Sequence, residues 1–95
     1  MIIKEPRANK AELIMHFLHE WNPVHAPGGD FFYYKVDAEE IAQSLRKNSS
    51  LQKVEDVVRE AVVFRMELDG VEEPFDEEGW KQCSQMIYAV LKQAR

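Results

Sequence analysis

Apolar residues recur every three or four positions in four separate stretches of this 95-residue chain. In the first stretch, NKAELIMHFLHEW, the apolar residues fall on one side of a helix: Leu13, Ile14, Phe17, Leu18 and Trp21. Asn9 is a suitable N-cap, and Asn22 followed by Pro23 is typical of a helix end. The pattern therefore predicts a first helix over residues 9–21.

The second and third stretches carry start and stop signals of their own. Asp37 is the predicted N-cap of a short helix over residues 37–47. The third stretch predicts a longer helix over residues 50–69, which Gly70 ends. Apolar and polar residues also alternate over residues 62–73, so a hairpin that turns at the Asp-Gly pair is an alternative for the end of this helix.

The fourth stretch begins with an acidic cap. Asp76 can cap a helix over residues 76–94, and Phe75 and Trp80 have the spacing of a hydrophobic staple. All connections between the four stretches are short except residues 22–36. We therefore expect the whole chain to be one all-α domain, a single antiparallel four-helix bundle with a long aromatic loop.

One charged residue interrupts the apolar side of the third predicted helix. Arg65 lies within about 30° of the centre of the apolar stripe, if each residue turns the helix by about 100°. A buried guanidinium group without a counterion is very costly. We therefore expect either that Arg65 pairs with a carboxylate or that the helix ends before this residue.

Composition and charge narrow the classes of function. The net charge is −5, and residues 37–78 carry thirteen acidic side chains against five basic ones. A protein that binds nucleic acid needs a basic face, so we expect no nucleic-acid partner. The single cysteine, Cys83, cannot form an intramolecular disulfide, and no stretch approaches the ~18 apolar residues of a membrane helix. We expect a cytoplasmic protein that does not bind membranes.

The stretch HFLHEWNPVHAPGGD contains three histidines and two acidic residues. Helix residues three or four positions apart share a face, so a metal site is one hypothesis. Its candidate ligands are His16, His19, Glu20 and His25. The alternative is an ordinary solvated helix face, because the first two histidines lie away from the apolar stripe. The sequence has no glycine-rich phosphate loop and no activated nucleophile, so we expect neither a cofactor nor an enzyme activity.

Four consecutive aromatic residues, FFYY at 31–34, overfill any single core face. Neighbours on a strand point to opposite sides, and four neighbours on a helix spread over about 300°, so at least one or two rings must lie on the surface. One hypothesis is an apolar platform for a partner, formed by Trp21, Val24, Phe32, Tyr33 and Tyr34. In the other, Phe31 or Phe32 caps the bundle and both tyrosines lie at its rim.

A second surface candidate is the acidic segment EEPFDEE, residues 72–78. Its acidic side chains can stabilise the start of the fourth helix through the helix dipole. Alternatively, Glu72, Glu73 and Phe75 belong to a negative patch that binds a basic partner.

The helix end HEWNP, the Gly/Asp loop, the aromatic residue before an acid-rich second helix and the two later amphipathic helices together resemble the YugE-like small proteins of bacilli. This resemblance covers residues 11–94 and implies a small helical bundle, with no activity, substrate or catalytic residue attached. From the aromatic and acidic surface segments we expect a protein–protein interaction or regulatory module, whose partner is another protein or a second copy. The alternative is a metal-binding or metal-sensing protein.

Overall fold

The computed structural model describes residues 9–25 and 32–93, and this part of the chain forms four α-helices. They are α1 (Lys10–Trp21), α2 (Lys35–Ser44), α3 (Leu51–Leu68) and α4 (Glu77–Gln93). The described residues contain no strand, so the predicted all-α class is confirmed. Residues 26–31 of the predicted loop and residue 94, the predicted end of the last helix, lie outside the described residues.

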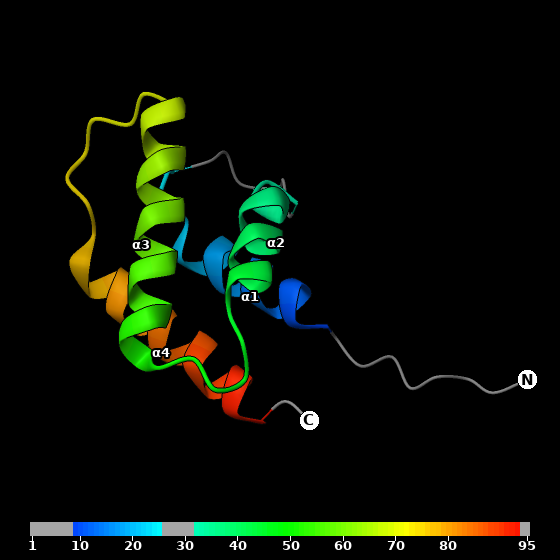
Figure 1. The fold of residues 1–95 in the computed structure, drawn as a ribbon. Coiled ribbons are helices and arrows are strands. Elements are labelled where there is room, and N and C mark those ends of the chain that lie inside the picture. The colour runs from blue at the N-terminus through cyan, green and yellow to red at the C-terminus, as the bar shows by residue number, and fades with distance from the viewer. Residues whose placement is uncertain (1–8, 26–31, 94–95) are drawn as a thin grey trace, which may run out of the picture.

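The helices pack as two crossed pairs. Figure 1 shows α2 and α3 side by side and running in opposite directions, with α1 and α4 crossing behind them. Each helix packs against the next one in the chain, and α4 also packs against α1, which closes the arrangement. The predicted four-helix bundle is therefore confirmed.

The first helix begins and ends as its sequence predicts. The side-chain oxygen of Asn9 accepts a hydrogen bond from the backbone N–H of Glu12 at 2.8 Å. At the other end, Asn22 adopts a left-handed conformation with φ of 51°, and its N–H donates to the carbonyl of Leu18. This residue type tolerates the left-handed region better than most, so it ends the helix at low cost.

The second helix was predicted at the wrong boundaries. It begins at Lys35 instead of Asp37 and ends at Ser44 instead of residue 47. Asp37 is not a cap, because its buried carboxylate pairs with Arg65 in the next helix. At the C-terminal end, Leu45 is extended and fully buried, so anchoring this side chain in the core stops the helix early.

The third helix continues to Leu68, so the hairpin alternative for residues 62–73 is wrong. Gly70 has a φ of 67° and donates its N–H to the carbonyl of Glu67, while Val71 donates to the carbonyl of Met66. These two bonds form a Schellman motif, the helix end for which glycine is favoured. The Asp-Gly pair thus ends a helix and does not turn a hairpin.

The predicted cap and staple of the fourth helix are confirmed. Asp76 accepts a hydrogen bond from the N–H of Gly79 at 3.0 Å. The rings of Phe75 and Trp80 meet edge to face, with centroids 5.9 Å apart. These contacts fix the direction in which the chain enters α4.

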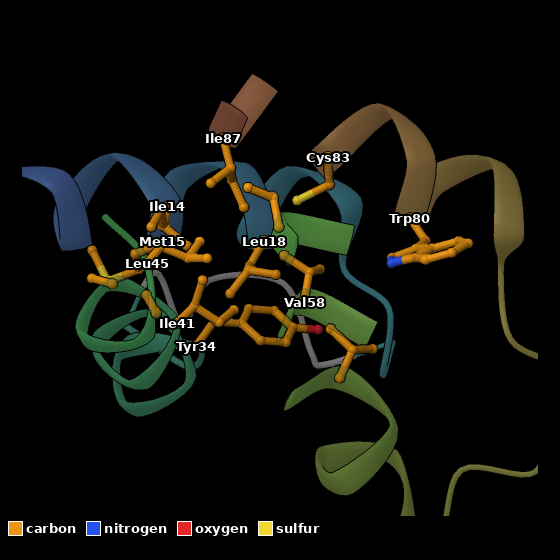
Figure 2. Close-up of a cluster of buried hydrophobic side chains, with 14 of the residues drawn as sticks. Ile14, Met15, Leu18, Tyr34, Ile41, Leu45, Val58, Trp80, Cys83 and Ile87 are labelled. Carbon is orange, nitrogen blue, oxygen red and sulfur yellow. The ribbon is translucent and has the colours of Figure 1, made fainter. Parts of the chain in front are cut away.

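Tyr34 lies in the core between the two helix pairs. Figure 2 shows its ring among buried side chains that include Leu18, Ile41 and Val58. Its hydroxyl donates to the side-chain oxygen of Asn22 at 2.8 Å and accepts from the N–H of Val24 at 3.2 Å. Burial raises the pKa of Tyr34 to about 12, so the ring stays neutral and keeps both bonds.

The described helices do not include one that is both long and apolar enough to cross a membrane.

The different placements of Tyr34 and Phe32 generate a prediction about stability. Truncating a core aromatic residue costs about 3–5 kcal/mol, whereas exposed substitutions usually change stability by less than about 0.5 kcal/mol. Tyr34 is 2% exposed and Phe32 is 63% exposed. We expect Tyr34→Ser to lower the free energy of unfolding in urea by several kcal/mol and Phe32→Ser to leave it nearly unchanged. Equal losses in the two variants would contradict these placements.

Candidate partner-binding groove

A groove of about 410 Å³ runs between α2 and α3 on the surface of the bundle. The residues that line it come from both helices: Glu40, Ile41, Ser44, Val57, Glu60, Ala61 and Phe64. Ile41 is fully buried and forms part of the core, while Val57 and Ala61 are half-buried and pack against the core. The floor of this α2–α3 groove is therefore apolar and supported from beneath.

The apolar side of α3 continues beyond the groove. Val57, Ala61, Phe64 and Leu68 are spaced at i, i+4, i+7 and i+11, which places them along one face of the helix. Phe64 is 58% exposed and Leu68 is 62% exposed. Both residues have the spacing of the apolar stripe, yet both are exposed. The reason is that Val54, Val58 and Val62 form the buried side of α3, and Phe64 and Leu68 lie about 120° and about 80° from its centre if each residue turns the helix by about 100°.

The facing side of α2 adds one more exposed apolar residue. Val36, Glu40 and Ser44 follow each other at intervals of four residues, so they share a face. Val36 is 56% exposed. The described part of the chain has five large apolar residues that are exposed, and three of them, Val36, Phe64 and Leu68, belong to these two helix faces.

An ion pair holds α2 against α3 at one end of the groove. The Nε atom of Arg65 donates to both carboxylate oxygens of Asp37, at 3.2 and 3.3 Å. Asp37 is buried, and burial raises the pKa of its carboxyl group while the guanidinium group beside it opposes that rise. Of the two alternatives for Arg65, pairing with a carboxylate is the correct one, and the helix continues past this residue.

Tyr33 extends this polar contact to the end of α3. Its hydroxyl donates to a carboxylate oxygen of Asp69, and this hydrogen bond raises the pKa of Tyr33. The guanidinium group of Arg65 lies 5.7 Å from the centre of the Tyr33 ring. The start of α2 is therefore tied to the last turn of α3 by a ring contact as well as an ion pair.

The structure divides the residues of the predicted aromatic platform. Val24 and Tyr34 are buried in the core, so the prediction that they belong to a partner-binding surface is wrong. Phe32 lines a separate hollow beside Ala11 and Met15, and Tyr33 lies against Arg65. The correct part of the argument is that the aromatic run splits between core and surface. Tyr34 is the buried ring, and its hydroxyl donates a hydrogen bond to Asn22 and accepts one from Val24.

Trp21 and Phe75 belong to a third location, at the start of α4. Their rings meet edge to face with centroids 6.0 Å apart, and the Trp21 indole donates to Asp76 at 3.1 Å. Arg59 stacks over Phe75 and forms a two-pronged ion pair with Glu77. These contacts are internal to the bundle, so they account for Trp21 and Phe75 structurally. Glu72 and Glu73 are exposed in the connection between α3 and α4.

A side chain at position 79 would disturb this third location. A Cβ atom placed there overlaps the indole of Trp21 and the carboxylate of Asp76. The glycine therefore allows α1 and α4 to approach closely.

The predicted metal ligands do not converge. His16, Glu20 and His25 are exposed and His19 is half-buried, and His25 lies beyond the helix with a φ of 55°. Within residues 9–25 and 32–93, no three His, Cys, Asp or Glu side chains are placed to hold one metal ion. The structure gives no support to the metal-binding alternative.

Neither a family model nor a curated protein nor a solved structure matches this chain. The resemblance to the YugE-like proteins therefore stays a prediction, and the functional argument rests on the residues of the groove.

The environment of Cys83 generates a prediction about its reactivity. The side chain is 1% exposed, and burial raises the pKa of its thiol to about 12. Because the thiolate is the reactive form, we expect iodoacetamide to label Cys83 very slowly in the native protein at mildly alkaline pH. Labelling should become rapid when urea unfolds the chain. Rapid labelling of the folded protein would contradict the placement of this cysteine in the core.

Proposed function

We propose that this protein is a protein–protein interaction or regulatory module, and not an enzyme, and that its partner binds in the α2–α3 groove. The observation that carries the proposal is a groove with an apolar floor that the exposed ring of Phe64 lines, while the exposed Val36 and Leu68 continue the same two helix faces beyond it. Exposed apolar patches on small proteins mark interaction sites, and aromatic residues are enriched at interfaces.

The energetics of the groove support a binding role. Keeping large apolar side chains in water is unfavourable by about 25 cal/mol for each Å² left exposed, and a partner that covers Phe64 and Leu68 recovers this free energy. The backbone beneath them is fixed by the contacts of Asp37 with Arg65 and of Ala61 with the core. A partner therefore meets a surface that is already ordered, which lowers the entropy lost on binding.

The net negative charge and the single free cysteine are compatible with a cytoplasmic protein. Cys83 is buried as a free thiol, and nothing in the fold of the described residues relies on a disulfide. A reducing compartment is compatible with such a protein. The partner is another protein or a second copy of the chain.

A photo-crosslinking residue tests this proposal in the native cell. Benzoylphenylalanine placed at Phe64 should form a defined adduct after irradiation, because the partner covers this ring. The matched control is the same residue at Phe32, which is 63% exposed against 58% for Phe64 but lies outside the groove. We expect adducts from position 64 and few from position 32.

Two outcomes of this experiment would contradict the proposal. Equal yields from the two positions would indicate collisions with any exposed aromatic residue. Adducts from position 32 alone would place the partner on the predicted aromatic segment instead of the groove.

A further inference from the structure

The α2–α3 groove has the dimensions of a site for one additional helix. The apolar line from Val57 to Leu68 covers eleven residue steps along α3, or about 16 Å at about 1.5 Å per residue. This length equals about three helical turns. A partner helix lying between α2 and α3 would place its own apolar residues, spaced at i, i+4 and i+7, against Ala61, Phe64 and Leu68.

The charges around the groove select among such helices. Both charged residues that line it are acidic: Glu40 on the α2 side and Glu60 on the α3 side. The two nearest arginines of α3 are already engaged, Arg65 with Asp37 and Arg59 with Glu77. An acidic helix would meet like charges on both sides of the groove, whereas a basic one would meet opposite charges.

The same charges disfavour a second copy as the occupant. The chain has a net charge of −5, and residues 37–78 hold thirteen acidic side chains against five basic ones. Pairing two identical grooves would bring the four carboxylates of Glu40 and Glu60 from both copies close together. Like charges at an interface oppose association.

Resting on the proposed function, we infer that the occupant of the α2–α3 groove is a basic amphipathic α-helix of a partner protein. Its apolar face covers Phe64 and Leu68, and its lysine or arginine side chains flank that face and pair with Glu40 and Glu60. The apolar contacts supply most of the affinity, and the carboxylates supply the selection for positive charge.

Three synthetic helical peptides of about 18 residues, long enough to span the groove, test this inference. They share one pattern of leucines at i, i+4, i+7 and i+11 and differ only at the flanking positions, which are lysine, glutamine or glutamate. Binding to the full chain is measured by fluorescence anisotropy of the labelled peptide. We expect the lysine peptide to bind at least about tenfold more tightly than the glutamine peptide, and the glutamate peptide to bind most weakly. The advantage of the lysine peptide should shrink as sodium chloride is added.

Substitutions in the protein then show which residues cause the preference for the lysine peptide. Glu40→Gln combined with Glu60→Gln should remove most of the preference for lysine over glutamine, while Phe64→Ser should weaken binding of all peptides. Glu39→Gln is the matched control for charge, because this neighbour of Glu40 faces a different hollow beside Asn9 and Ala11. Phe32→Ser is the matched control for an exposed ring. Neither control should change the affinities.

A result that contradicts the basic helix can be distinguished from one that contradicts the proposed function. Equal affinities of the three peptides, all lost in Phe64→Ser, would overturn the basic partner and leave the groove as a binding site. Self-association of the wild-type chain in analytical ultracentrifugation, lost in Phe64→Ser, would overturn it in favour of a second copy. Failure of the lysine peptide to bind also overturns the inference, and the crosslinking yield at position 64 then decides the proposed function separately.

Discussion

The ion pair between Asp37 and Arg65 is the contact on which the arrangement of α2 and α3 depends. The two residues lie 28 positions apart in the chain and meet with the carboxylate almost fully buried. Withdrawing the carboxylate and part of the guanidinium group from water costs free energy, and the hydrogen bonds from Nε to both carboxylate oxygens offset part of that cost. A slide of α2 along α3 would leave a buried carboxylate unpaired. The pair therefore fixes how the two helices align, and this alignment creates the groove.

Core contacts also fix both ends of α2. Leu45 leaves the helix to enter the core, and Tyr34 enters the core just before the helix begins, so anchors at both ends limit α2 to ten residues. Such a helix is about 15 Å long, whereas the eighteen residues of α3 span about 27 Å. The core side of α3 is formed by Val54, Val58 and Val62, and Phe64 and Leu68 point away from it and are exposed. One set of core contacts thus produces both the stability of the bundle and the surface that we assign to the partner.

Local signals in the sequence predicted most of the fold. The periodic apolar faces predicted four helices, and the caps at Asn9 and Asp76 were correct, because they depend on residues within one turn. The boundaries of α2 were wrong, because Asp37 resembles a cap but is drawn into a contact with a distant helix. The cost of burying Arg65 alone left two alternatives, a carboxylate partner or an earlier helix end, and the structure shows the partner. Its partner was not, because a contact between helices depends on how the whole chain packs.

The candidate site was harder to predict than the fold, for a physical reason. An apolar stripe on a helix reveals which residues share a face, but only the packing of the neighbouring helices shows which of them are buried. The spacing of Phe64 and Leu68 therefore places them on the apolar stripe of α3 without showing that they are exposed. For the four consecutive aromatic residues, the sequence showed that some rings must lie on the surface. It did not show which ring is buried. Tyr34 became the core residue through its bonds to Asn22 and Val24.

A double-mutant cycle tests most directly whether the ion pair fixes α2 against α3. The free energy of unfolding would be measured in urea for the wild type, Asp37→Asn, Arg65→Met and the combined variant. The account predicts a coupling free energy of about 1–3 kcal/mol, since the residues touch and share one buried contact. The exposed pair of Arg59 and Glu77 serves as the reference and should show a smaller coupling. Losses that add within about 0.3–0.5 kcal/mol for Asp37 and Arg65 would contradict the account.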